Sequence, residues 1–429
     1  MGSLFVMVVF YFLFLLRMPV CISMGIASLI YILSFGGITI KLIPQIMAHG
    51  VQNFVLLAIP FFIFAGNVMN NGGMTERIFK LASSIIGHAR GGLAHVVVVA
   101  TIIFSGCSGS ALADCAGLGT VVVRAMDDAG YSRKFAAAIT LAAATIAPVV
   151  PPSLMMIIYA FLANTSIGHL FFAGIIPGLL MGLTLMIEIY WLVTTKRRHC
   201  PAEAWQGFSN VVRVFRKGFL AAIAPLVILF GIFGGVVTIT QAGLLATAYC
   251  IMVGFLYREL KLRDLPQVLM TTMKQTVVIF FIISTATLVS WIITKEGAPG
   301  ILANLILGLT RDKYLILMMI NVFLLVVGCL IETVPAMILT VPVLMPILDA
   351  IGVDRVHFGV IICLNLAIGF AAPPMGIGIY VMSAVARLTP EEVIKDTLPL
   401  ILPLLIVLFL ITLVPQISLF LPNLLFGKS

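Results

Sequence analysis

Long runs of apolar residues, separated by short polar breaks, fill most of this 429-residue chain. A chain that crosses lipid must satisfy its backbone hydrogen bonds internally, so runs that are apolar on every side favour helices over open strands. The apolar runs lie near residues 3–35 (with a break predicted at Pro19), 53–70, 91–105, 133–148, 151–163, 168–195, 219–237, 241–257, 275–294, 314–330, 357–371, 374–387 and 397–426. This pattern predicts an all-α polytopic membrane protein.

Two further stretches, 105–130 and 328–350, are interrupted by glycine, serine and proline too often to cross a membrane cleanly. Irregular backbone at membrane depth is tolerated only where protein or water covers it. We therefore predict a re-entrant helical hairpin at each stretch.

The two predicted hairpins belong to an internal repeat. A shift of 222 residues aligns residues 106–158 with the second half of the chain at 11 identities in 53 positions, without a gap. Two related halves, each with a broken hairpin and a proline-interrupted helix, are typical of inverted-repeat transporters with a binding site near the bilayer midplane. The identical positions, numbered in the first half, are Gly106, Cys107, Val121, Asp127, Gly130, Arg133, Ile139, Ile146, Pro151, Pro152 and Ile157.

Composition agrees with a membrane location and excludes several classes of protein. Hydrophobic residues make up 62% of the chain and charged residues 10%, against about 25% charged in a typical soluble domain. This excludes a secreted enzyme, a nucleic-acid-binding domain and a disordered scaffold, so we expect a lipid bilayer and no nucleic acid as partner. The seven cysteines contain no C-x-x-C pair and the six histidines no H-E-x-x-H motif, which favours core positions over a metal site.

The net charge of +9 gathers in loops rather than in the apolar runs. Basic residues beside membrane spans mark the cytoplasmic side. The densest basic segment, which we predict to be cytoplasmic, comprises Lys196, Arg197, Arg198, Arg213, Arg216 and Lys217, offset only by Glu203 and flanked by Trp191 and Trp205. A second cluster two spans later falls on the same side: Arg258, Lys261 and Arg263. The apolar N-terminus, Ser3 to Leu16, lacks a basic region and a cleavage motif, so we expect a retained first span.

The first polar constellation runs from Ser105 to Asp114 and places hydroxyls and glycines next to a carboxylate inside an apolar region. Glycine permits a tight tip with exposed carbonyls, which suit Na⁺, and free N–H groups at a half-helix start suit a substrate carboxylate. An intramembrane carboxylate is itself a functional indication, although small residues also serve close helix crossings. We assign Ser105, Gly106 and Ser108 to sodium binding, and Ser108, Ser110 and Asp114 to substrate binding.

The second constellation, Thr145 to Ser153, holds three prolines that break an apolar helix and free its carbonyls. A cation is a suitable partner for such carbonyls, and a simple helix kink is the alternative. We assign Thr145 and Pro148 to sodium, Ser153 to the substrate at the start of the resumed helix, and Ser166, in the loop beyond it, to the substrate cavity.

The second half carries the counterparts of both constellations. We assign sodium binding there to the hairpin residues Gly328, Glu332 and Thr333, and to the interrupted helix at Asn365, Ala367 and Ala372.

At these segments the chain resembles the large membrane subunit of tripartite ATP-independent periplasmic (TRAP) transporters. The likeness covers almost the whole chain and rests on the joint order of Ile59 to Gly66, Ser108 to Ala111 with Asp114, Gly130-Tyr131, Pro151 to Ser153, Gly352, Asp354, His357 to Gly359, Asn365, Gly369, Pro373-Pro374 and Gly376. Two positions depart from the family pattern: Ala372 precedes the second Pro-Pro where threonine is often found, and Glu332 stands where aspartate is common.

The resemblance implies an elevator-type ion-transporter fold in the bacterial inner membrane. It implies uptake of an organic acid, such as a C4-dicarboxylate, a sugar acid or sialic acid, coupled to Na⁺, with two ions expected. A periplasmic substrate-binding protein would deliver the acid, and a small four-helix membrane subunit would buttress the scaffold. No enzyme activity is expected.

This organisation divides the chain into six parts. We expect scaffold helices in 1–70, a first repeat in 71–195, a cytoplasmic basic linker in 196–218, scaffold helices in 219–294, a second repeat in 295–390 and a C-terminal scaffold helix in 391–429.

Two other functions were weighed. An intramembrane serine protease could use Ser108 as nucleophile, but it requires a base within hydrogen-bond reach, and His88, His95 and His169 lie far along the chain. A channel-type anion permease would leave the matched pair of hairpins unexplained.

Overall fold

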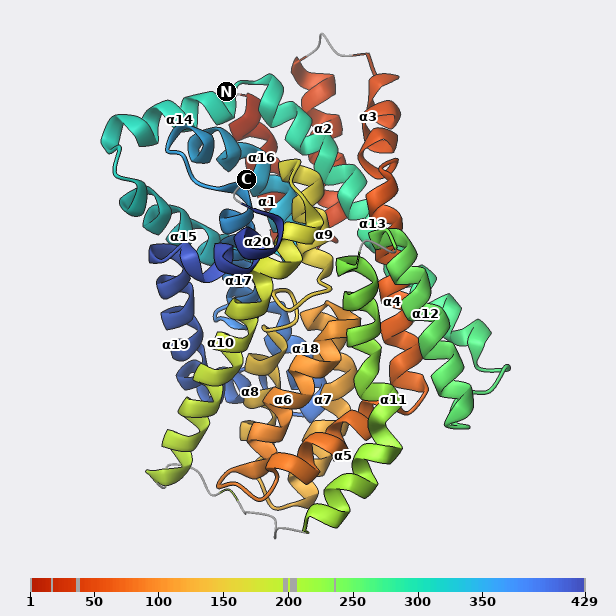
Figure 1. The fold of residues 1–429 in the computed structure, drawn as a ribbon. Helices are drawn as coiled ribbons and strands as arrows, with labels where there is room; N and C mark the ends of the chain where they lie inside the picture. Colours follow the sequence, from red (N-terminus) through yellow and green to blue (C-terminus); the bar gives the residue numbers. More distant parts are fainter. Residues whose placement is uncertain are drawn as a thin grey trace.

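The computed structural model describes residues 2–427, apart from 17, 36–38, 196–199, 201–206 and 235–236, and within them the chain is helical and without strands (Figure 1). The helices are α1 (Gly2–Leu15), α2 (Val20–Phe35), α3 (Leu42–Val51), η1 (Phe54–Leu57), α4 (Ala58–Asn71), α5 (Met74–Ile86), α6 (Gly92–Ser108), α7 (Ala111–Asp128), α8 (Arg133–Ala144), α9 (Leu154–Ala163), α10 (Ile167–Thr194), α11 (Phe208–Phe233), α12 (Ile239–Leu256), α13 (Leu265–Lys295), α14 (Ala298–Leu309), α15 (Lys313–Leu330), α16 (Thr333–Ala350), α17 (Arg355–Ala371), α18 (Ile377–Ala386), α19 (Pro390–Leu413) and α20 (Gln416–Phe426).

Eight helical segments among the described residues are long and apolar enough to cross a membrane. They are the segment Phe54–Asn71 and the helices α10, α11, α12, α13, α15, α16 and α19. The prediction of an all-α polytopic membrane protein is therefore confirmed. The break expected at Pro19 is also present, because α1 ends at Leu15 and α2 begins at Val20.

Prolines interrupt fewer helices than the sequence predicts. In the second hairpin, α16 continues through Pro342 and Pro346, and the chain turns only at Ile331 and Glu332. The opposite error occurs at the C-terminus, where a single scaffold helix was expected. Val414 and Pro415 end α19 there and start a separate helix, α20, because proline cannot donate to the preceding turn and restrains the residue before it.

The internal repeat extends over most of the chain. The bounds of α16 are those of α7 shifted by 222 residues, and both helices have 18 residues. The same shift brings α5 close to α14, α6 close to α15, α9 close to α18 and α10 close to α19. A prolonged α13 stands where the first half has α3, η1 and α4.

The two halves are inverted with respect to each other. In Figure 1 the interrupted helix α8–α9 runs from the lower part of the molecule to the upper part, whereas α17–α18 runs from the upper part to the lower. The halves also interlock, since α7 packs on α18 and α16 packs on α9. Each hairpin therefore rests on the resumed helix of the other half.

Helices α8 and α17 form the centre of the molecule. Every residue of α8 from Phe135 to Ala144 and of α17 from Val356 to Ala371 is buried. Small residues on α8, six of them alanine, let its neighbours approach closely.

Only part of the basic segment lies within the described residues. Its residues Lys196, Arg197, Arg198, Glu203 and Trp205 lie outside the described residues. The remainder belongs to α11, which begins at Phe208 and carries Arg213, Arg216 and Lys217 on exposed positions. The predicted linker therefore ends in a helix that continues into the following span.

Candidate functional site

Gly109 forms the tip of the first hairpin. It adopts a left-handed backbone conformation, with φ of 57°, and its N–H donates to Ser105 O at 2.9 Å. A side chain at this position would place its Cβ 2.6 Å from Pro152 O. The tip is thus pressed against the broken helix, and Leu154 N donates to Gly109 O at 3.3 Å. Only glycine meets both the conformational and the steric requirement here.

Behind this tip lies a buried carboxylate with hydroxyl partners. Asp114 is 1% exposed, its Oδ1 accepts a hydrogen bond from Ser108, and its Oδ2 lies 3.0 Å from Ser105 Oγ. Ser110 caps the N-terminus of α7, where its Oγ accepts from Ala113 N at 3.4 Å. The hydroxyls expected at a sodium or substrate site are therefore gathered around one carboxylate, and they tie the two arms of the hairpin together.

The interruption between α8 and α9 is held by its own side chains. Thr145 Oγ1 donates to Ala142 O at 2.7 Å, and Ser153 Oγ donates to Pro148 O at 2.6 Å. Ser153 also caps α9, because its Oγ accepts from Met156 N at 3.2 Å. The Pro-Pro bonds of both halves, at 151–152 and 373–374, are cis.

The second hairpin lacks such a closed polar network. Glu332 precedes α16 without a side-chain capping hydrogen bond, and both Glu332 and Thr333 are half-buried. Gly328 packs directly on Gly369, where an added Cβ would lie 2.6 Å from the Gly328 carbonyl carbon. The turn is therefore held by backbone packing.

Asn365 brings an amide into the buried centre of the second half. Its Nδ2 donates to Asn321 O and to Asn321 Oδ1, each at 3.0 Å. Its Oδ1 is buried and finds no hydrogen-bond partner among the described residues. A buried carbonyl oxygen without a donor is a suitable ligand for a cation, since leaving it unpaired is otherwise unfavourable.

Both hairpin tips line one cavity of about 570 Å³. Five predicted site residues line it: Ser108, Ser110, Pro148, Glu332 and Thr333. Ser105, Asp114, Thr145 and Ser153 are buried behind the lining. The cavity lies between the tips on one side and helices α4 and α13 on the other, since Asn67, Lys274 and Gln275 complete its polar wall.

The other predicted residues lie away from the cavity wall. Ser166 is exposed and caps α10, where its Oγ accepts from His169 N at 3.4 Å. Gly106 faces Pro225 of α11, whose Cβ would lie 2.6 Å from an added side chain. In the second half, Gly328, Asn365 and Ala367 are buried, and Ala372 ends α17 with its N–H on Gly369 O at 3.1 Å.

Sequence reasoning missed the wall contributed by α4 and α13. The apolar run predicted near 275–294 begins just after Lys274, whereas α13 begins at Leu265 and includes it. A lysine inside an apolar helix is a recognisable signal. The apolar run alone does not include it, because that run begins at 275, directly after Lys274.

The geometry does not support a serine nucleophile at Ser108. Its hydroxyl is bonded to Asp114, and no histidine is found among the described residues that line the cavity. His95 lies near the start of α6, and His169 packs against Phe426 at a centroid distance of 4.5 Å. The histidine base that this alternative requires is therefore not beside this serine among the described residues that line the cavity.

Comparison with known proteins agrees with this architecture. Residues 6–417 match the family described as "Tripartite ATP-independent periplasmic transporter, DctM component". The sialic acid TRAP transporter large permease SiaM of Vibrio cholerae is 39% identical, over 96% of each chain. The C4-dicarboxylate large permease DctM of Pseudomonas aeruginosa is 34% identical, over 94% of each chain. The sialic acid permease SiaT of Haemophilus influenzae is 39% identical over 95% of this chain and 66% of its own length.

Solved structures with the same fold are more distant in sequence. The YdaH transporter of Alcanivorax borkumensis superposes with a TM-score of 0.63 at 14% identity, over 86% of each chain. MtrF of Neisseria gonorrhoeae superposes with a TM-score of 0.61 at 12% identity, over 90% of this chain and 83% of its own. The relatives are transporters and not enzymes, and the chain belongs to the DctM family of TRAP transporter large permeases.

Proposed function

We propose that this chain is the permease of a Na⁺-coupled uptake system for an organic acid in the bacterial inner membrane. The observation that carries this proposal is the joint cavity of the two hairpin tips, which come from inverted halves of the chain. Backbone N–H groups at the starts of α7 and α16 give that cavity two positive helix ends, which favour a carboxylate.

Oxygen atoms behind the tips support the coupling to Na⁺. In the first half, the proposed ligands are Ser105, Ser108, Thr145 and the carbonyls of Gly106 and Pro148, the latter of which also accepts from Ser153 Oγ. In the second half, the buried and unpartnered Oδ1 of Asn365 supports an ion site together with Gly328, Glu332, Thr333, Ala367 and Ala372. Oxygen donors of this kind suit a hard cation.

The substrate class follows from the cavity and from the relatives. The named substrates of similar permeases are sialic acid, C4-dicarboxylates and isethionate, all organic anions. We propose that the anion lies at Ser108 and Ser110, with Asp114 and Ser153 supporting these groups from behind; Ser166, which caps α10 away from the cavity, is left out of this site. A periplasmic binding protein would deliver it, and a small four-helix subunit would support the scaffold.

An elevator motion fits the position of the cavity. We propose that helices α6–α9 and α15–α18 move together against α4 and α13, which form the opposite wall. Substrate and Na⁺ would shift this equilibrium only through different affinities for its two states.

Uptake into proteoliposomes tests the proposal. The permease, the small subunit and the binding protein are combined, and uptake of labelled N-acetylneuraminate, succinate and isethionate is measured in Na⁺ and in choline. Uptake that collapses in choline is expected. Equal rates in the two salts would overturn the coupling.

A further inference from the structure

Lys274 is a cation in the interior of a long apolar helix. It is the tenth residue of the 31-residue α13, so it lies roughly 14 Å along the helix axis from Leu265 at 1.5 Å per residue. A charged side chain inside a membrane-spanning helix is unfavourable unless a partner or water meets it. In this molecule the side chain lines the cavity that both hairpin tips share.

The polar residues next to Lys274 are already hydrogen-bonded to other groups. Asn67 Nδ2 donates to Gln275 Oε1 at 2.8 Å and to Thr272 Oγ1 at 3.0 Å, which fixes both groups on the wall. Lys274 itself makes no hydrogen bond or ion pair with the rest of the described chain, and its side chain is exposed to the cavity. Lys274 therefore borders a space that has room for a ligand and brings three ammonium donors that no described residue uses.

The charges around the cavity define what this ligand must be. Among the described residues that line it, Lys274 is the one cation and Glu332 the one carboxylate, and the two form no ion pair. The ammonium lies on α13, whereas the helix N-termini that also favour an anion lie on the two hairpins. An anion in the cavity would therefore face positive charge on both walls, from the Lys274 ammonium on α13 and from the helix N-termini of the hairpins.

We propose that Lys274 binds the negatively charged group of the substrate from the α13 wall and thereby selects the acid over neutral analogues. This inference rests on the proposed function. Because Lys274 is not part of the hairpins, it contacts the substrate only while the tips face α13. The contact therefore favours this arrangement over any in which the hairpins have moved away.

The test compares an acid with its uncharged ester. Binding of N-acetylneuraminate and of its methyl ester to the purified complex of permease and small subunit is measured for the wild type, for Lys274→Met and for Lys274→Arg. Lys295→Met is the matched control, because Lys295 ends the same helix, lies beside the Trp291 ring and does not line the cavity. Thermal melting of all variants shows whether each is folded.

The wild type is expected to prefer the acid, and Lys274→Met is expected to reduce that preference at least about tenfold, as for the loss of a charge-assisted hydrogen bond. Lys274→Arg and Lys295→Met should stay within about twofold of the wild type. A wild-type preference retained in a folded Lys274→Met variant would overturn the inference, as would a wild type that binds acid and ester equally. Uptake by the wild type that is equal in Na⁺ and choline would refute only the coupling, since the preference for acid over ester is measured separately.

Discussion

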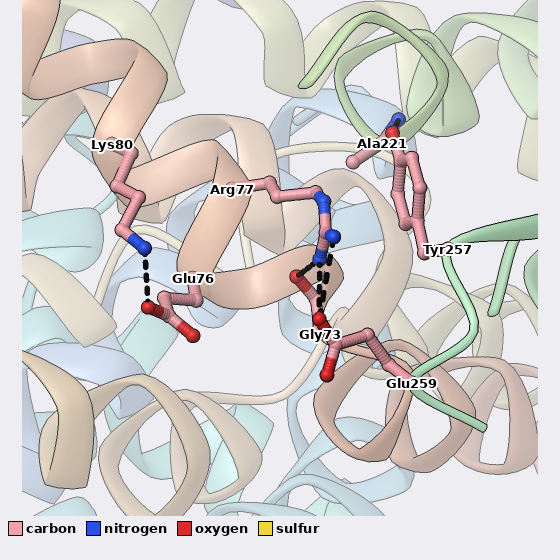
Figure 2. Close-up of polar contacts among 7 residues, drawn as sticks. All are labelled: Gly73, Glu76, Arg77, Lys80, Ala221, Tyr257 and Glu259. Carbon is pink, nitrogen blue, oxygen red and sulfur yellow. Dashed lines mark hydrogen bonds and ion pairs between the residues drawn. The ribbon is translucent and has the colours of Figure 1, made fainter. Parts of the chain in front are cut away.

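Two helices related by the internal repeat, α5 and α14, are held in opposite ways. Gly297 and Gly73 start them in the same left-handed conformation, but α5 is clamped by polar groups and α14 is not. Figure 2 shows Arg77 of α5 bonded to both Gly73 and Glu259. Its guanidinium donates to Gly73 O at 3.1 Å and to Glu259 Oε1 at 3.3 Å. The same guanidinium lies 4.0 Å from the centre of the Tyr257 ring.

No comparable clamp is found on the described residues of α14. Only Pro299 and Ala303 are buried there, and three large apolar side chains one turn apart are exposed: Ile301, Leu305 and Leu309. In the first half, α5 is therefore bonded to the loop after α12. In the second half, the equivalent helix α14 has exposed apolar side chains and no such bond among its described residues. The repeat therefore retains the backbone path of these two helices but not the side-chain contacts that stabilise them.

The hairpins show the same contrast. The first is closed by a buried carboxylate with two serine partners, whereas the second turns on a contact between two glycines. Substitutions that remove one kind of support should therefore affect one half and spare the other.

The largest effect is expected at the first hairpin. Asp114→Asn replaces one of the two oxygens that accept from Ser105 and Ser108 by an amide donor, and leaving a buried hydrogen bond unmade costs about 1–3 kcal/mol. Uptake should fall about 10- to 100-fold and the melting temperature should drop. Glu332→Gln, with no capping hydrogen bond to lose, should lower uptake with little change in melting.

Asp128→Asn is the control for this prediction, because Asp128 is exposed on the same helix and pairs with Arg124 at 4.0 Å. Wild-type uptake by Asp114→Asn would show that the carboxylate network is dispensable.

The second effect concerns the glycine contact of the second hairpin. Gly369→Ala would press a methyl group against the Gly328 backbone, and overpacking of this kind typically costs about 1–3 kcal/mol. We expect a lower melting temperature of the purified protein. Gly308→Ala is the matched control, since nothing lies within 4 Å of an added Cβ there and alanine favours a helix. Equal melting of the two variants would mean that α15 and α17 accommodate the added methyl group without cost.

A smaller effect is expected at the clamp on α5. Arg77→Met removes an ion pair whose partners are 25% and 50% exposed and a ring contact, so we expect a loss of about 1 kcal/mol after allowance for solvent screening. Lys80→Met on the same helix breaks only the exposed pair with Glu76 and should change stability by less than about 0.5 kcal/mol. A double-mutant cycle with Glu259→Gln isolates the pair. Zero coupling would assign the clamp to the Tyr257 ring and the Gly73 carbonyl.

The smallest effect is a pH dependence at the turn after α7. Arg133 donates to Asp127 at 2.8 Å and holds the pKa of that carboxyl below its ordinary value. Asp127 therefore contributes stability above about pH 4, its unfolded range, and this contribution is lost as the pH falls through the lowered folded value.

Thermal melting between pH 6 and pH 3 checks this sign. The acid-induced loss of stability should be slightly smaller for Asp127→Asn than for the wild type. The repeat places a matching pair at Asp349 and Arg355, 2.9 Å apart, so Asp349→Asn serves as the comparison. Parallel curves for the wild type and Asp127→Asn would remove this pair from the acid response.

Several features of the fold were predictable from local pattern. Apolar runs located the helices, and the paired Gly106/Gly328 and Pro151/Pro373 matches located both hairpins and both broken helices. Helix ends are harder to predict. Pro342 lies inside α16, where neighbouring helices cover it, whereas Pro415 separates two helices where the chain turns. Local sequence does not show whether neighbouring helices will cover a given proline.

The candidate site shows the same division. Intramembrane polar residues such as Asp114 and Glu332 stand out in a chain with 10% charge, because lipid tolerates few of them. Their positions relative to one another do not follow from the sequence. Lys274 lies on a wall of the cavity only because α13 passes the tips, and Ser166 caps a helix away from it.

The sequence by itself determined that this is a helical membrane protein built from two related halves, since periodicity and composition report what each segment can bury. The repeat and the family resemblance also predict that the halves are inverted. Only the tertiary structure decided that their hairpin tips share one cavity and that Lys274 completes it. The reason is physical: burial is a property of a segment, whereas a binding site depends on distances between segments far apart in the chain.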